Sequence, residues 1–195
     1  EFPLIFKTAI VKPLLKKTAL DSKDLKNYRA ISNLSFMSKV LEKVVLSQIL
    51  QHINCNNLLS DFQSAYHLHY GTETALLKVT NDLLSAMDDG KISVLVLLDL
   101  SAAFDTPDHE ILLHRLHNVF SFGNTVLSWF QSYLENRTQT VVVHGKHSTP
   151  ASLRYGVPQG SVFGPILFIL YTQPLSNVIQ HYPVFHQMYA DDTQI

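Results

Sequence analysis

The stretch Met188–Thr193 reads MYADDT, and it places two adjacent carboxylates, Asp191 and Asp192, at a point where the chain is expected to reverse direction. The segments 184–189 and 193–195 are typical of short strands, and the small and polar residues between them favour a tight hairpin. A third carboxylate, Asp99, ends the apolar run SVLVLLD at 93–99, which predicts a strand covered on both faces. If these strands are neighbours, the three acids converge on one edge of a sheet.

Clustered carboxylates repel one another unless a cation compensates their charge. Mg²⁺ suits such a cluster because it prefers hard oxygen ligands and keeps positions open for phosphate oxygens. Two ions about 3.5–4 Å apart would clamp an in-line displacement at phosphorus, which is the chemistry of nucleotidyl transfer. A solvated turn and a polar strand end would explain each motif by itself, so the assignment depends on the other motifs.

The remaining elements alternate between helical and extended patterns. Apolar spacing predicts an α+β fold, with helices over 38–53, 72–87, 107–119, 125–135 and 165–179, and a hairpin of strands over 138–144 and 151–155. The apolar residues of the first helix are Val40, Leu41, Val44, Val45, Ile49 and Ile53, and those of the second are Leu76, Val79, Leu83 and Leu84.

Composition limits the classes of protein to consider. With 195 residues, 46% of them apolar, the chain can bury a core of one large or two small domains. A net charge of −1 predicts no general attraction to nucleic acid, although residues 1–29 carry seven cations against three acids. Cys55 is the single cysteine, which excludes an internal disulfide and fits a reducing compartment. No apolar run is long enough for a membrane helix, so no membrane partner is expected.

Three motifs occur in the order and approximate spacing of core motifs of reverse transcriptases. They are DLSAAFD at 99–105, GVPQGS at 156–161 followed by Gly164 and Pro165, and YADD at 189–192. The sequence resembles most closely the polymerases of non-LTR (LINE-type) retrotransposons. The likeness also includes AIVKPLLKK, LKNYRAISNL, GTETALL and WFQSYL, so that it covers nearly the whole chain.

The resemblance implies a right-hand polymerase, with fingers over residues 1–90 and a palm over 91–195. The palm would have a ferredoxin-like sheet with flanking helices, and the two regions would form one continuous, truncated domain. The implied activity is RNA-directed DNA polymerase, with an RNA template, a DNA primer and dNTPs as partners, in the nucleus and cytoplasm. Because the chain has no initiator Met and stops near its third motif, we expect a fragment without the thumb and the upstream endonuclease.

The resemblance also assigns residues to the metal site. Asp99 and Asp191 would be the main ligands of two Mg²⁺ ions, with Mn²⁺ as an alternative ion. Asp192 would be a looser ligand, and the carbonyl of Leu100 would join them.

Other residues would contact the nucleotide. Phe104 resembles the family's aromatic steric gate, whose ring fills the space of a ribose 2′-OH; an ordinary core aromatic is the simpler reading. Gln159 and Gly160 would lie against the incoming nucleotide, although a strand-to-helix connection also explains the glycines. Arg29 is the cation expected to hold triphosphate or template, while most nearby lysines form a solvated face.

Departures from the family pattern keep other functions open. Ala30 stands where proline is usual, His67 where a basic residue is usual, Phe163 in place of leucine and Pro107 in place of a β-branched residue. Such losses suit an inactive remnant or a domesticated nucleic-acid-binding module. A different two-metal phosphotransferase is a third hypothesis.

One predicted helix carries side chains of the types that bind zinc. Glu110, His114 and His117 have helical spacing, and two histidines with an acid could bind zinc. The sequence offers no fourth ligand, so a polar helix face is the preferred reading.

Overall fold

The structure, a computed structural model, describes residues 1–67, 69–100 and 102–195 and divides into two compact units. The first unit contains Glu1–Gln48 and Phe104–Gly164, and the second contains Ile49–Ala103 and Pro165–Ile195. Each unit is therefore assembled from two separate stretches of chain. The predicted fingers (1–90) and palm (91–195) are functional regions. A division into compact units does not test them, so their boundaries stay a prediction.

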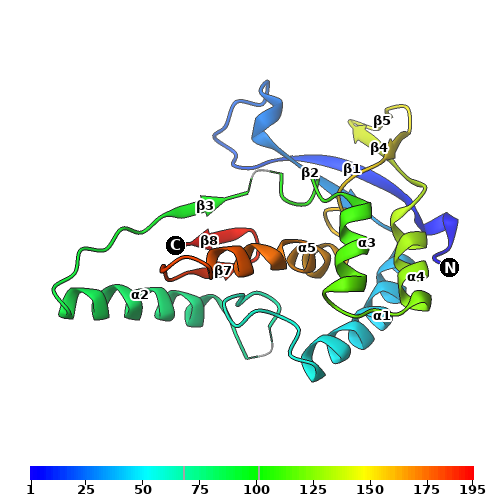
Figure 1. Cartoon of the computed structure of the whole chain (residues 1–195). Helices are drawn as coiled ribbons and strands as arrows, with labels where there is room; N and C mark the ends of the chain where they lie inside the picture. The colour runs from blue at the N-terminus through cyan, green and yellow to red at the C-terminus, as the bar shows by residue number, and fades with distance from the viewer. Residues whose placement is uncertain (68, 101) are drawn as a thin grey trace. The chain divides into compact units, whose positions relative to one another are not determined.

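The first unit is built on a five-stranded sheet with the order β2-β1-β4-β5, in which β6 also pairs with β4 (Figure 1). The pairing of β1 with β4 is parallel, and the other pairs are antiparallel. Short 3-10 helices precede β1 and β2. The bounds are η1 Leu4–Phe6, β1 Thr8–Leu15, η2 Leu25–Asn27, β2 Tyr28–Asn33, β4 Arg137–Val143, β5 Lys146–His147 and β6 Ala151–Leu153.

The second arm of the predicted hairpin is in two pieces. β5 follows the turn at once and pairs with the end of β4, whereas β6 pairs with the beginning of β4. Between them, the amide of Val141 donates to the Ser148 hydroxyl, and Pro150 has no amide hydrogen to offer a strand ladder. The strand predicted for 151–155 begins where expected but is too long, because β6 ends at Leu153.

Helices α3 (His109–Asn118) and α4 (Asn124–Leu134) pack together within the first unit. The predicted start of α3 at Pro107 was too early, because Asp108 is the N-cap and its carboxylate accepts from the amides of Glu110 and Ile111. The core of the unit includes an aromatic cluster of Trp129, Phe130, Tyr133 and Phe163, with ring centroids 5.3–5.8 Å from the Phe163 ring. Phe163 thus fills a packed site rather than disturbing one.

The second unit has a three-stranded antiparallel sheet with the order β3-β8-β7 (Figure 1). Helix α2 packs against β7. Helix α1 contributes residues to both units, and α5 lies in the second unit apart from Gly164. The bounds are α1 Phe36–Cys55, α2 Thr72–Asp88, β3 Leu97–Asp99, α5 Gly164–Ile179, β7 Gln187–Tyr189 and β8 Asp192–Gln194.

The predicted α+β class is confirmed, and so is the hairpin at the YADD motif, with shorter arms than expected. None of the helices in the described ranges is long and apolar enough to cross a membrane.

The expectation that the 93–99 strand is covered on both faces was wrong. Val94 is 77% exposed and Leu97 is 69% exposed. Only Leu97–Asp99 forms a strand, and β3 is an edge strand whose ladder partner among the described residues is β8. An apolar run indicates that burial of its side chains would be favourable. It does not show that another helix or strand packs against them.

Two predicted helix faces were right only in part. In α1, Ile49 and Ile53 are buried as expected, but Val40 and Val44 are exposed. Ser38 and Glu42 are buried in their place, on the stripe that continues to Ile49. In α2, Val79 and Leu83 are half-buried, whereas Leu76 and Leu84 are exposed and Ala75 is the buried residue. Each helix has several apolar positions, and only tertiary packing decides which of them face a partner.

Candidate functional site

The carboxylates of the second unit come together through strand register. Asp99 is the residue directly opposite Asp192 in the β3–β8 pair, and Tyr189 is opposite Asp192 in the β7–β8 pair. Directly opposite residues of an antiparallel pair share one face, with Cβ atoms about 4.5–5.5 Å apart. Asp192 therefore lies between Asp99 and Tyr189 on one face of the sheet. Both Asp99 and Asp192 are exposed to solvent.

The donor set of this face fits a divalent ion completed by substrate. No group of three or more His, Cys, Asp or Glu side chains that could hold a metal occurs among the described residues, which include Asp191 and the Glu110, His114 and His117 helix face. Mg²⁺, however, is usually bound through one or two carboxylates together with substrate phosphates, and not in an all-protein cage. Asp99 and Asp192 provide two such oxygen donors. The roles of Asp191 and of the exposed Leu100 as ligands stay predictions.

A segment upstream of α2 contacts the acidic turn. The side chain of Gln63 accepts a hydrogen bond from the amide of Ala190, at 3.0 Å. Burial, and then the charges of Tyr189 and Asp191, raises the pKa of the Tyr66 phenol. The acidic turn is thus held through Gln63, for which no role was predicted.

The predicted nucleotide-binding residues of the first unit meet at the loop 156–161. The amide of Val157 donates to the carbonyl of Phe104 at 2.7 Å, and the amide of Ser32 in β2 donates to the carbonyl of Gln159 at 2.8 Å. A side chain at Gly164 would begin 3.7 Å from the Phe104 ring. Phe104 and Gln159 are therefore parts of one loop cluster, which also touches β2.

Two glycines make this close packing feasible. Gly156 has φ of +80°, and a Cβ there would lie 2.6 Å from the carbonyl oxygen of Phe104. Gly160 has φ of +111°, and its Cβ would lie 2.6 Å from the carbonyl oxygen of Ser32. Both positions exclude other residues on sterics and on backbone conformation. These two glycines therefore let the loop pack closely against other backbone segments of the same chain.

A buried carboxylate holds the far end of the loop. Glu42 is 0% exposed, and its Oε2 accepts from the amides of Val162 at 2.7 Å and Phe163 at 3.3 Å. Its Oε1 accepts from the hydroxyl of Ser38 at 2.8 Å. At the near end, Nε2 of His109 lies 2.8 Å from the carbonyl oxygen of Gly156. The loop is tied at both ends.

Arg29 lies on an exposed face of β2. Register pairs Arg29 with Leu14 and Ile31 with Lys12, so that Arg29 and Lys12 are diagonal neighbours on one side of the β1–β2 ribbon. Both cations are exposed. This face carries positive charge on the strand that also contacts the loop through Ser32.

Sequence reasoning found the acids and the loop but missed Glu42, Gln63, Tyr66 and His109. The sequence contained a signal for Glu42. Ser38 and Glu42 are four residues apart, as Ile49 and Ile53 are, and all four are buried in α1. Gln63 lies in no periodic pattern, and its contact with Ala190 spans 127 residues of sequence.

Comparison with known proteins identifies the family. The family model described as reverse transcriptase (RNA-dependent DNA polymerase) matches residues 15–195. The RNA-directed DNA polymerase from mobile element jockey of Drosophila melanogaster is 32% identical over the whole chain, which covers 21% of that protein. The probable RNA-directed DNA polymerase from transposon BS of the same species is 30% identical over 89% of this chain and 19% of its own length. The chain thus spans about a fifth of the length of these relatives.

A solved structure gives the fold. The structure of apo telomerase from Candida tropicalis, truncated from its C-terminal domain, is similar to this chain, with a TM-score of 0.65 and 17% sequence identity. The alignment covers the whole of this chain and 44% of the telomerase chain. The fold is therefore that of a right-hand polymerase, as expected. With the family model matching nearly all of its length and retrotransposon polymerases among its relatives, the chain belongs to the reverse transcriptase (RNA-dependent DNA polymerase) family, and within it to the non-LTR, LINE-type group.

Proposed function

We propose that this chain carries the nucleotidyl-transfer centre of an RNA-directed DNA polymerase from a non-LTR retrotransposon. It would extend a DNA primer on an RNA template with dNTPs. The observation that carries the proposal is the register that sets Asp99 opposite Asp192, beside the turn that contains Asp191. These exposed carboxylates, far apart in sequence, share a sheet face that is open to a substrate.

Asp99, Asp191, Asp192 and the carbonyl of Leu100 would hold two Mg²⁺ ions, for which Mn²⁺ can substitute. Bound ions of this kind activate the attacking hydroxyl and neutralise the triphosphate. Reverse transcriptases generally use divalent metal ions, and the hard oxygen donors present here suit them. Backbone pairing of β3 with β8 keeps two of these donors, Asp99 and Asp192, on one face.

The first unit would supply the nucleotide contacts. Gln159 and Gly160 would lie against the incoming nucleotide, and Arg29 would hold phosphates by charge. Phe104 would be the steric gate. The half-buried position of Phe104 and its bond to the loop that carries Gln159 support this assignment.

The whole protein would contain further parts. Residues 1–90 and 91–195 would act as fingers and palm, and a thumb and an endonuclease would belong to the full-length polymerase. The cysteine, Cys55, is exposed and unpaired, which fits the reducing nucleus and cytoplasm in which we place the protein.

Primer extension on poly(rA) with oligo(dT) tests the proposal, using the purified chain alone and fused to a thumb. We expect Asp99→Asn to lower extension by about 10²-fold or more, because a metal-binding carboxylate is lost. Asp89→Asn is the matched control, since Asp89 is an exposed acid of the same unit that pairs with Lys91 at 2.8 Å and not with the sheet. Equal extension by Asp99→Asn and the wild-type chain would refute the metal-site assignment.

The gate role of Phe104 has a separate test. Phe104→Val removes the aromatic ring and should let ribonucleotides be incorporated, which the same extension assay measures. Unchanged discrimination between dNTPs and rNTPs would remove this role from Phe104.

Nucleic-acid binding without turnover is the second candidate function. The exposed Arg29 and Lys12 face favours it, because this face does not depend on the carboxylates of the other unit. Filter binding of RNA across a salt series tests it: affinity should fall as salt rises, and Arg29→Ala should weaken binding and flatten the slope. RNA binding without extension by the thumb fusion would favour this candidate over the polymerase.

A further inference from the structure

The turn between β7 and β8 contains a backbone conformation that needs support from outside the turn. Ala190 has φ of 54°, in the left-handed region that disfavours residues with a Cβ atom. Such residues persist where surrounding contacts hold them, and they are concentrated at functional sites. Asp191 follows directly, and Asp192 begins β8. Whatever holds Ala190 therefore also sets the positions of the two carboxylates.

Gln63 supplies the contact that holds Ala190. Its side chain is 1% exposed, and its Oε1 accepts from the amide of Ala190 at 3.0 Å and from the amide of Ala65 at 3.0 Å. Its Nε2 lies 3.5 Å from the carbonyl oxygen of Ala190, which is long for a hydrogen bond. A single amide oxygen thus joins the turn to a segment far upstream.

The backbone around Gln63 is itself fixed against β7. The amide of Met188 donates to the carbonyl of Phe62 at 2.7 Å, and the amide of Ser64 donates to the carbonyl of Met188 at 2.9 Å. These bonds make a parallel bridge between Gln63 and Met188. The side chain therefore starts from a fixed point on the strand whose turn it holds, and it has little freedom to leave.

The chemical type of this side chain suits its position. A neutral amide accepts the backbone hydrogens without adding negative charge beside Asp191 and Asp192, where another carboxylate would disfavour ionisation of all three.

We propose that Gln63 is a positioning residue, whose amide oxygen holds Ala190 in its left-handed conformation and so presents Asp191 and Asp192 for binding a divalent ion. The metal-binding part of this inference rests on the proposed function. The effect of Gln63 on the turn does not.

Two substitutions at Gln63 separate the hydrogen bonds from the packing. Gln63→Met keeps length and volume but removes the acceptor, and we expect the Ala190 amide to exchange with solvent about tenfold faster. Gln63→Glu keeps an acceptor oxygen and, at a pH where the new carboxyl group is protonated and adds no charge beside Asp191, should leave that exchange slow. Amide exchange is measured by NMR on the 195-residue chain, and affinity for Mn²⁺ alone is measured by electron paramagnetic resonance. Gln63→Met should also weaken Mn²⁺ binding severalfold.

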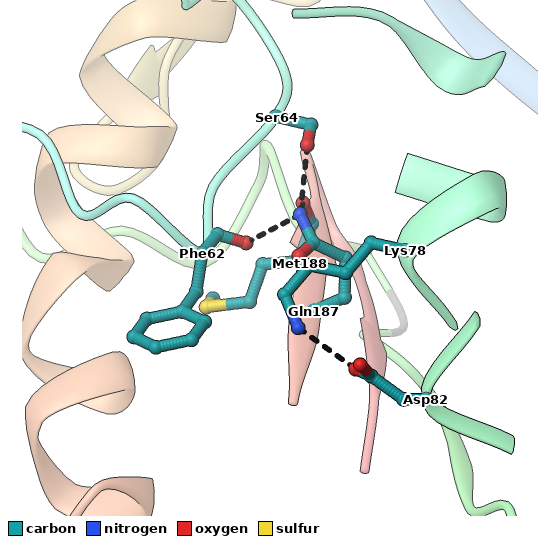
Figure 2. A network of polar contacts seen from close by, with 6 residues as sticks. All are labelled: Phe62, Ser64, Lys78, Asp82, Gln187 and Met188. Carbon is teal, nitrogen blue, oxygen red and sulfur yellow. Dashed lines mark hydrogen bonds and ion pairs between the residues drawn. The ribbon is translucent and has the colours of Figure 1, made fainter. Parts of the chain in front are cut away.

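Gln187→Met is the matched control. Gln187 is also buried, and its Nε2 donates to the carbonyl of Phe62 at 2.9 Å and to the hydroxyl of Ser64 at 2.7 Å (Figure 2). It therefore binds the same segment through Phe62 and Ser64, and not through the amide of Ala190. This variant should leave exchange at Ala190 unchanged. Equal acceleration in both methionine variants would show that loosening of the whole segment controls the turn, and it would overturn the inference.

Other outcomes distinguish the two proposals. If the Ala190 amide exchanges in folded Gln63→Met at the wild-type rate, Gln63 has no positioning role. The same conclusion follows if this amide exchanges as fast in Gln63→Glu, with its new carboxyl group protonated, as in Gln63→Met. If the exchange results are as expected but the wild-type chain does not bind Mn²⁺, the proposed metal site fails and the role of Gln63 in shaping the turn stands.

Discussion

The loop 156–161 and the turn 189–192 are each held by one buried polar side chain, but the two side chains differ in charge. Glu42 holds the residues after the loop with a carboxylate that accepts two backbone amides. Gln63 holds the turn with an amide oxygen that also accepts two. Both anchors come from parts of the chain that lie more than 100 residues upstream of what they hold.

The difference follows from what each segment carries. The loop contains no acid, so a buried carboxylate next to it adds hydrogen-bond strength without repulsion. The turn contains Asp191 and Asp192, beside which another charge would be costly. The charges of Glu42 and Gln63 therefore match the segments that they hold: a carboxylate holds the loop without acids, and a neutral amide holds the acidic turn.

A substitution in the loop gives the largest expected effect. Gly160→Ala should destabilise the chain by about 4 kcal/mol, because it adds both a backbone clash with Ser32 and an unfavourable φ. Gly145→Ala is the control, since Gly145 also has positive φ, of +76°, but no atom within 4 Å of its Cβ position. It should cost about 1 kcal/mol. Urea unfolding followed by the fluorescence of Trp129, the single tryptophan, measures both, and equal costs would show that the loop is not tightly packed.

The next effect concerns the charged anchor itself. Glu42→Leu should cost about 3 kcal/mol, because the buried amides of Val162 and Phe163 lose a charged acceptor. Glu42→Gln keeps an acceptor and should cost about 1 kcal/mol. Urea unfolding measures the free energy of unfolding of both Glu42 variants, and of Gln63→Met in the turn for comparison. If Gln63→Met were as costly as Glu42→Leu, charge would not distinguish the two anchors.

The smallest effect is a dependence on pH near the turn. His186 precedes β7, stacks on Phe62 with ring centroids 4.3 Å apart, and has Nε2 3.0 Å from the Ser176 hydroxyl oxygen. Burial, and then the charge of Lys78, lowers the pKa of this imidazole. Because the unfolded chain binds the proton more readily, the stability contributed by neutral His186 is present above its ordinary value of about 6.5 and is lost as pH falls below that value.

Urea unfolding between pH 7.5 and pH 5, compared for the wild type and His186→Phe, measures this contribution. Phenylalanine keeps a ring against Phe62 but cannot titrate, so the variant should lose less stability on acidification. An equal loss in both proteins would assign the pH dependence to groups other than His186.

Much of the fold was predictable because the deciding signals are local. The turn at 189–192, the start of a helix after the 156–161 loop, and the end of a strand at Asp99 each follow from a few adjacent residues. The errors concern burial: the apolar run before Asp99 is exposed, and the inward stripe of α1 runs through Ser38 and Glu42 instead of Val40 and Val44. Periodicity shows that a helix has an apolar face, but it does not rank faces of similar hydrophobicity.

The sequence by itself determined the family, the acids Asp99, Asp191 and Asp192, and the glycines that the loop requires, since these depend on residue type and order along the chain. Only the tertiary structure decided that Asp192 is the acid opposite Asp99, and that Glu42 and Gln63 hold the loop and the turn. Strand register and contacts across more than 100 residues depend on how separate segments pack. No local pattern encodes that packing, because each contact is stabilised by the whole set of neighbours that brings its two residues together.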